Sequence, residues 1–333
     1  MDVVRRIHND RSDLDEDTDP ILEDSYKVGY EGPKKVPETR RCKYVIEPLI
    51  FLVFSAASSK PAIVAQFVQS SLQKNLTDNL TNNNDDQTEA AQFLLLVNVF
   101  HSIPTLITIT LLGPWSDMIG RKPVMYIGLI GLILDTLIAV LIVVFDGNIY
   151  YLYVSKAISG CCGGVKGFLF GSFSYIADRS PIGDRAVRIV VAEGIMILIS
   201  AIVSVCIGFW IDASGFVLPF TSILSIYVIS LLYLIFVPES LIPPPQVNRL
   251  RVLIRFSHFR DSFKIFLIQG RKGILIKICC AAFFLNLLAF SGKLNVLFLY
   301  VMRPPLNWDP IDIGIYAAVS TIIIIGFRRR NVK

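Results

Sequence analysis

The stretch FLLLVNVFHSIPTLITITLLGPWSDMIGRKPVMYIGLIGLILDTLIAVLIVVF, residues 93–145, holds two long apolar runs joined by the polar island GPWSDMIGRK at 113–122. Each run is about 20 residues long, the length that an α-helix needs to cross the hydrocarbon core of a bilayer. Because no water is available there to bond the backbone, a lone spanning segment has to be helical. The stretch therefore predicts two membrane-spanning helices connected by a short polar turn.

The rest of the chain repeats this pattern. Of its 333 residues 53% are hydrophobic, and the mean hydropathy is +0.57. The net charge of +5 is spread over short connections, which argues against a nucleic-acid-binding surface. We predict an all-α integral membrane protein with eight spans embedded in the lipid bilayer. The spans are 44–69, 90–112, 123–145, 149–177, 189–211, 216–237, 274–302 and 311–327.

The spans divide into unequal groups. Residues 44–237 form a predicted six-span N-terminal bundle, and 238–273 a basic cytoplasmic linker that opens with a proline run. Residues 274–327 would be the first two spans of a second bundle, followed by a basic cytoplasmic tail at 328–333. We expect residues 1–43 to be a disordered cytoplasmic N-terminus, because they are acidic and poor in aromatic side chains.

Lysine and arginine set the orientation. They concentrate in the connections between spans two and three, four and five, and six and seven, which predicts that this side is cytoplasmic. The loop on the other side, NLTDNLTNNNDD, contains two N-x-T sequons, at Asn75 and Asn79. Such sequons are glycosylated on the extracellular or lumenal side, so the sequence predicts a multi-pass glycoprotein.

The polar island contains more than a membrane turn requires. Arg121 and Lys122 are enough to orient the helices, whereas Gly113 and Gly120 indicate a tight turn, and Asp117 has no topological role. The pattern G-x-x-x-D-x-x-G-R-K resembles the signature loop of the major facilitator superfamily. The resemblance implies a helical bundle of twelve spans in two halves. It also implies a conformational switch in which Asp117 meets the N-terminus of a helix in the opposite half.

Further runs are similar to the solute-carrier family that contains the proton-coupled folate transporter. These runs are VIEPLIFLV (45–53), LLGPWSDMIGRKP (111–123), YIADRS (175–180), DRAVRIVVAEG (184–194) and LYVMRPPLNWDPIDIGIY (299–316). Other family-matching residues in them are Glu47, Asp178, Arg185, Arg188, Trp308 and Asp309. The resemblance implies a secondary transporter that moves a small organic anion by alternating access, with a proton as coupling ion and no other cofactor.

Ionisable residues inside the spans are candidates for the substrate and proton pathway, because charges are costly at mid-membrane. Glu193 matches the proton-coupling glutamate of the family, although a carboxylate near a helix N-terminus is also stabilised by the helix dipole. Lys156, Lys166 and Lys293 would attract an anionic solute; the alternative is that they extend toward the interface. His101 would relay protons, or would simply bond between helices.

Two departures from the family bear on the substrate. The span-four aspartate of the folate transporter falls at Gly164, and its span-seven histidine falls near Phe290. Both positions carry proton coupling in that relative. We therefore expect an organic anion other than folate, although a folate-like solute is kept as a possibility.

The resemblance fades near Tyr316, which indicates a C-terminally truncated member of the family. The second hypothesis is a truncated, non-transporting isoform that regulates or pairs with a full-length transporter. An enzyme is not supported, because the chain has no HExxH, no phosphate loop and no nucleophile beside a His–acid pair. The six cysteines lack metal-ligand spacing, and we expect them to be buried small side chains.

The expected localisation follows from the transporter class and from one short sorting motif. A solute carrier with glycosylated outer loops is expected first in the plasma membrane. An acidic dileucine pattern at 17–22 makes the endosomal or lysosomal membrane the second expectation.

Overall fold

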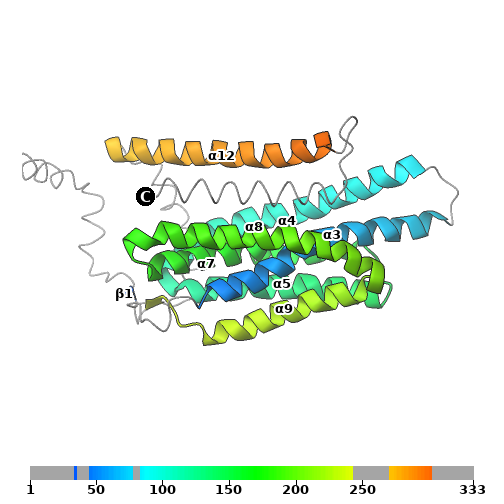
Figure 1. Cartoon of the computed structure of the whole chain (residues 1–333), viewed down its shortest axis with the longest axis horizontal. Coiled ribbons are helices and arrows are strands. Elements are labelled where there is room, and N and C mark those ends of the chain that lie inside the picture. The colour runs from blue at the N-terminus through cyan, green and yellow to red at the C-terminus, as the bar shows by residue number, and fades with distance from the viewer. Residues whose placement is uncertain (1–33, 36–44, 78–82, 243–269, 302–333) are drawn as a thin grey trace, which may run out of the picture.

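The computed structural model describes residues 34–35, 45–77, 83–242 and 270–301, and Figure 1 shows their arrangement. The helices are α3 (Glu47–Thr77), α4 (Asn83–Ile119), α5 (Arg121–Val144), α6 (Tyr151–Cys161), α7 (Gly164–Arg179), α8 (Ile182–Ser214), α9 (Val217–Phe236) and α12 (Arg271–Val301). Two short strands, β1 (Lys34–Lys35) and β2 (Leu241–Ile242), complete the described elements.

Helices α3 to α9 lie side by side in one bundle, which confirms the predicted all-α membrane architecture (Figure 1). Helix α5 is central: it packs against α6, α7 and α9. Helix α3 packs against α8 and α9, and α4 packs against α6. Helix α12 lies apart from this bundle in Figure 1 and runs roughly parallel to it.

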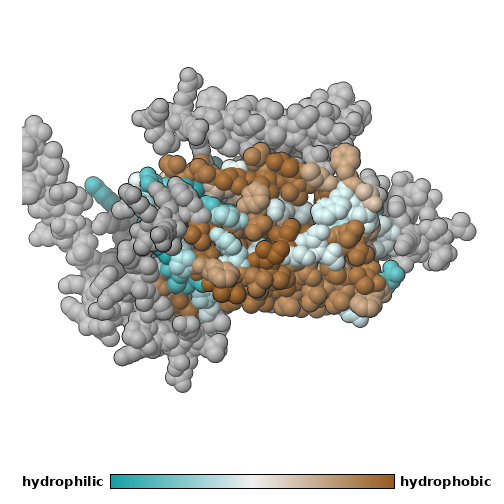
Figure 2. Space-filling view, turned by 60° about the horizontal axis from the view of Figure 1, so that its bottom comes forward, coloured by the Kyte–Doolittle hydropathy of each residue, from teal (hydrophilic) through white to brown (hydrophobic). Residues whose placement is uncertain are grey.

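The bundle is apolar on its sides as well as inside. Its core contains large buried side chains such as Leu49, Met125, Phe168 and Phe220. Figure 2 shows hydrophobic residues over the sides of the bundle, whereas hydrophilic residues gather toward one end. An exposed apolar surface of this extent fits a lipid solvent.

Within the described residues, four helices are long and apolar enough to cross a membrane. They are Glu47–Leu72 in α3, Ala91–Ile119 in α4, and the whole of α5 and α9. The predicted span at 311–327 lies outside the described residues.

The predicted loop between spans two and three is wrong in its length. Helix α4 continues through the polar island to Ile119, and α5 begins at Arg121, so the connection is Gly120 alone. Gly120 has φ 114°, a conformation that a residue with a Cβ rarely adopts. Polar side chains do not end a helix by themselves, and here the reversal comes from one residue with positive φ.

The single span predicted at 149–177 is also wrong, because it is divided into α6 and α7. Helix α6 ends at Cys161 and α7 begins at Gly164, with Gly163 at φ 78° and Gly164 at φ 48°. The adjacent glycines make this break possible, since both are in the left-handed region.

Strand β1 pairs antiparallel with β2, with Lys34 opposite Ile242 and Lys35 opposite Leu241. The pairing joins two residues of the segment predicted to be disordered to the first residues after α9. The rest of 1–43, the linker residues 243–269 and the tail 328–333 lie outside the described residues. The domain boundaries therefore stay predictions.

The expectation that the cysteines are buried is wrong for most of those described. Cys161, Cys206, Cys279 and Cys280 are exposed, and Cys162 is half-buried. A thiol behaves as a small apolar group, so it is compatible with a surface that faces lipid as well as with a protein core.

Close packing of α5 on α7 leaves no room for a side chain at Gly128. A Cβ on Gly128 would lie 2.8 Å from the backbone nitrogen of Phe168, which cannot move without shifting α7. We expect Gly128→Ala to destabilise the protein by about 1–3 kcal/mol, the usual range for overpacking. Gly183→Ala is the control, because nothing lies within 4 Å of its Cβ position. Thermal unfolding in detergent, followed by size-exclusion chromatography, measures both; equal midpoints would contradict this packing.

Candidate functional site

The break between α6 and α7 lies deep in the bundle. At a rise of 1.5 Å per residue, Gly164 is about 22 Å along α7 from Arg179, at the end of the bundle where hydrophilic residues gather. The first N–H groups of α7 have no partners within the helix and carry the positive end of its dipole. The break therefore places the N-terminus of a helix at a depth where the sequence predicts only a continuous helix.

Next to the break, a buried charge cluster joins three helices. Lys60 of α3 donates a hydrogen bond to Asp135 Oδ2 of α5 at 2.7 Å, and Lys156 of α6 donates to the same oxygen at 3.0 Å. Lys60 also donates to Thr136 Oγ1 at 2.9 Å. Two ammonium groups thus share one carboxylate inside a span, and we call these three ionised residues the Lys60–Asp135–Lys156 triad.

The members of the triad differ in access. The side chain of Asp135 is 2% exposed and that of Lys60 is 5% exposed, whereas that of Lys156 is 17% exposed. Lys156 is therefore the member closest to the bundle surface. The predicted site residue Lys156 is part of this cluster, and Lys60 is a residue that sequence reasoning missed.

His101 lies on α4 beside the break. A Cβ on Gly164 would be 3.1 Å from His101 Nε2, and one on Gly160 would be 2.6 Å from the His101 carbonyl oxygen. That carbonyl accepts a hydrogen bond from Thr105 Oγ1 at 2.6 Å. The structure thus places His101 against the α6–α7 connection.

Lys166 and Glu193 are exposed on α7 and α8, and neither belongs to the triad. Lys166 lies about 20 Å along α7 from Arg179, and Lys60 and Asp135 lie at comparable distances from Glu47 and Arg121. Charges from three helices, α3, α5 and α7, therefore occur at similar depth. Lys293 belongs to α12, but its side chain is outside the described part of the structure.

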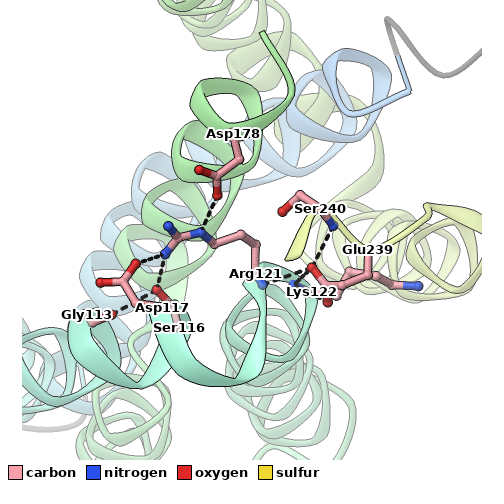
Figure 3. Close-up of polar contacts among 8 residues, drawn as sticks. All are labelled: Gly113, Ser116, Asp117, Arg121, Lys122, Asp178, Glu239 and Ser240. Atoms are coloured by element: carbon pink, nitrogen blue, oxygen red, sulfur yellow. Dashed lines mark hydrogen bonds and ion pairs between the residues drawn. The ribbon is translucent and has the colours of Figure 1, made fainter. Parts of the chain in front are cut away.

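At the polar end, Arg121 joins α4, α5 and α7 (Figure 3). Its Nε lies 2.8 Å from Asp178 Oδ2 of α7, and its Nη1 lies 2.6 Å from both Asp117 Oδ1 and Ser116 Oγ of α4. Asp117 is 64% exposed, whereas Asp178 and Arg121 are largely buried. Two residues of the polar island, Asp117 and Arg121, thus belong to an ion-pair cluster, with Asp117 near the surface.

Glu239, which follows α9, caps the N-terminus of α5 (Figure 3). Its carboxylate accepts hydrogen bonds from the backbone N–H groups of Arg121 at 3.0 Å and Lys122 at 3.2 Å. A carboxylate in this position satisfies free backbone donors and complements the helix dipole. A Cβ on Gly120 would lie 2.7 Å from Glu239 Oε2, so the glycine is needed for this contact as well as for the turn.

A second ion pair lies at the same end. Arg188 of α8 contacts Glu47 Oε1 of α3 at 2.7 Å and donates to Ser180 Oγ at 2.9 Å. Arg185 is half-buried on the preceding turn. The structure thus pairs two of the family-matching residues across the bundle.

The described ends of the three predicted cytoplasmic connections meet at one end of the bundle, and the basic residues at 249–264 lie outside the described residues. Arg121, Asp178, Arg188 and Glu239 belong to the three predicted cytoplasmic connections or their helix ends, and they meet at one end of the bundle. Gly113 lies on α4 one turn before Ser116, whose hydroxyl donates to its carbonyl oxygen.

Several other predicted positions cannot be placed. Asn75 falls near the end of α3, and Asn79, Trp308 and Asp309 lie outside the described residues. Within the described ranges, no group of three or more His, Cys, Asp or Glu side chains is arranged to hold a metal ion.

Sequence signals existed for the two residues that were missed. Lys60 directly precedes Pro61 inside a span, and Glu239 stands in the PES sequence that ends the sixth span. Neither signal identifies the residue's partner, because Asp135, which contacts Lys60, and Arg121, which contacts Glu239, are far away in sequence. The partners appear only when α3, α5 and α9 are packed together.

Comparisons with known proteins agree with this architecture. A sequence model of the Major Facilitator Superfamily matches residues 49–330. The proton-coupled folate transporter of Rattus norvegicus is 25% identical over 290 residues, covering 83% of this chain and 62% of that protein. The lysosomal proton-coupled steroid conjugate and bile acid symporter SLC46A3 of Gallus gallus is 23% identical over 304 residues, covering 84% and 66%.

A solved structure has the same fold. The crystal structure of the human organic anion transporter MFSD10 (TETRAN) matches with a TM-score of 0.59 and 16% identity, covering 86% of this chain and 70% of that chain. At this identity the likeness shows the fold and not the activity.

The match covers most of this chain but only part of its relatives. The chain spans 62% of the rat folate transporter and 66% of the chicken symporter. These relatives are transporters rather than enzymes, as the sequence predicts. With a family match over residues 49–330, and curated relatives in solute carrier family 46, the chain belongs to the major facilitator superfamily.

Proposed function

We propose that this protein is a secondary transporter of a small organic anion, coupled to protons and operating by alternating access. The observation that carries the proposal is the divided helix α6–α7, which has a lysine on each side of its break. A lysine at the centre of a spanning helix costs about 2.5–3.5 kcal/mol on insertion scales, so such residues are retained for function. Lys156 and Lys166 together give this helix two positive charges.

The break adds a second attraction for anions. In transporters with discontinuous helices, the N-terminus of a half-helix points toward anionic groups of the substrate. The N-terminus of α7 supplies such donors at Gly164, and the lysines supply charge on both sides of it. A carboxylate or sulfonate is the chemical group that suits this combination.

The relatives support the same solute class. Their names describe transport of folate, steroid conjugates and bile acids. Folate and bile acids are amphipathic organic anions at neutral pH. We infer an amphipathic anion for this protein, because a site with lysines between apolar helices suits both parts of such a molecule.

Proton coupling is proposed for ionisable groups near the pathway. Both relatives are named as proton-coupled, and Glu193 and His101 lie on α8 and α4 of this bundle. An acidic compartment on the donor side would drive anion entry through such groups. The plasma membrane is the first proposed location, and the lysosomal membrane, named for one relative, is the second.

The Arg121 cluster gives the proposed alternation a mechanical basis. Arg121 joins α4, α5 and α7, and Glu239 ties the end of α9 to α5. These contacts hold the polar ends of four segments, α4, α5, α7 and α9, as one unit. A bundle that moves as one unit is what rocking against a second bundle requires.

Uptake measurements test the proposal directly. The protein encoded by the complete native transcript would be expressed at the surface of cells and supplied with radiolabelled taurocholate, a bile acid, or folic acid. We expect uptake of at least one probe to be faster at pH 5.5 than at pH 7.4, because protons are the coupling ion. Cells without the protein are the control, and uptake equal to theirs at both pH values would refute the proposal.

Lys166 is expected to act in the pathway rather than in folding. It is exposed on α7, so its truncation leaves no buried partner uncompensated. We expect Lys166→Ala to reduce uptake by about tenfold, since a hydrogen bond to a charged group contributes about 1.5–3 kcal/mol. Surface biotinylation should show normal protein levels. The exposed Lys277→Ala of α12 is the matched control, and unchanged uptake in Lys166→Ala would remove this lysine from the site.

Transport is expected to depend on the planar, forked guanidinium of Arg121. Arg121 uses separate nitrogens for Asp178 and for Asp117 with Ser116, which a lysine cannot reproduce. We expect Arg121→Lys to lower the uptake rate by about tenfold or more through loss of these charged hydrogen bonds. Arg271→Lys, at the exposed start of α12, controls for the exchange itself. If the two variants transported equally, the cluster would have no part in the transport cycle.

A further inference from the structure

The Lys60–Asp135–Lys156 triad has an imbalance that simple helix pairing does not require. It holds two ammonium groups and one carboxylate, so its formal charge is +1 at a site where Asp135 and Lys60 are almost fully buried. A pair of opposite charges would be neutral. The extra ammonium is a charge that the described surroundings leave uncompensated.

The two lysines are held differently. Lys60 donates to both Asp135 Oδ2 and Thr136 Oγ1, at 2.7 and 2.9 Å. Thr136 is itself fixed by a 2.7 Å hydrogen bond to the Leu132 carbonyl oxygen. Lys156 has one such bond, at 3.0 Å, and is the more exposed of the two. Lys60 is therefore the anchored cation, and Lys156 is the one that can exchange partners at lower cost.

The two carboxylate oxygens of Asp135 also differ in their hydrogen bonds. Both lysines contact Oδ2, whereas the buried Oδ1 has no hydrogen-bond partner among the described residues. An unsatisfied buried acceptor is unfavourable, and protonation would convert this acceptor into a hydroxyl donor without breaking a hydrogen bond. Oδ1 is thus the atom on which a proton would be held.

The groups that surround Asp135 come from each neighbouring helix. Lys60 of α3 and Lys156 of α6 contact Asp135, and Thr136 of α5 contacts Lys60. The charge of Asp135 also acts on His101 of α4 and Tyr227 of α9, and Lys166 of α7 acts electrostatically on His101. The Tyr227 hydroxyl is fully buried and has no hydrogen-bond partner within the described part of the chain. Among these groups Asp135 is the only acid.

We propose that Lys156 is the binding cation for the carboxylate or sulfonate of the transported anion, and that Asp135 is an internal competitor for it. This inference rests on the proposed anion transport. In the anion-free state Asp135 occupies Lys156. The solute takes over this ammonium, Asp135 then keeps only Lys60 as a cationic partner, and Oδ1 accepts a proton from water on the acidic side. The proton returns to water when the solute leaves. One proton then moves with each anionic group.

Asp135→Asn tests this competition, because the amide keeps the size of the side chain and removes its charge. Uptake of radiolabelled taurocholate and folic acid by the complete protein would be measured at pH 5.5 and 7.4. We expect KM at pH 7.4 to fall by about tenfold, within the range of typical coupling between two ligands. We also expect uptake to lose its stimulation at pH 5.5, since the variant mimics the protonated state.

Two further variants separate this role from folding. The double variant Lys60→Met/Asp135→Asn removes the buried ion pair as a unit, which proteins tolerate better than the loss of one partner. It should show the same low KM and the same flat pH response. Lys156→Gln should lose uptake by about tenfold or more at both pH values, with normal surface protein. Lys277→Gln on α12 is the matched lysine control.

The outcomes distinguish the two proposals. If wild-type uptake of both probes equals that of cells without the protein, anion transport itself is refuted, and the role of the triad falls with it. If wild-type uptake is stimulated by acid and the double variant keeps both the pH response and the KM, only the triad mechanism is overturned. A Lys156→Gln variant that transports normally would overturn it in the same way.

Discussion

The arrangement of this bundle depends on the rule that an ionised group inside a membrane is costly unless it pairs with another polar group or faces a water-filled cavity. Asp135 and Lys60 are almost fully buried, and they contact at 2.7 Å across α5 and α3. Their contact fixes how these two helices face each other, because any rotation would separate the charges. Lys156 extends the same constraint to α6, and through α6 to the break before α7.

The same rule acts in a different setting at the polar end. Arg121 and Asp178 are buried, but Asp117 and Ser116 keep the cluster connected to the surface. Glu239 adds no ion pair of its own with Arg121; it accepts the backbone N–H groups that start α5. The two clusters lie about 20 Å apart along α5, so the helix carries one constraint at its polar end and one near the middle of the apolar layer.

Glycines make both clusters possible. Gly120 allows the reversal that brings the start of α5 against Glu239, and Gly163 and Gly164 allow the division of α6 from α7. Close contacts at Gly128 and Gly160 then bring α5 and α4 against that divided helix. Without these approaches the lysine of α6 could not reach the carboxylate of α5.

The sequence by itself determined the helical class, the side on which the basic connections meet, and the family, because these depend on residue composition, span length and local motifs. It also identified Lys156, Lys166, Glu193 and His101 as ionisable residues inside spans. Only the tertiary structure decided that Lys60 shares Asp135 with Lys156, that Glu239 caps α5, and that the fourth span is divided. The reason is physical. The sequence shows that an ionisable residue lies inside a span, but its partner lies on another helix, and only helix packing brings the two side chains together.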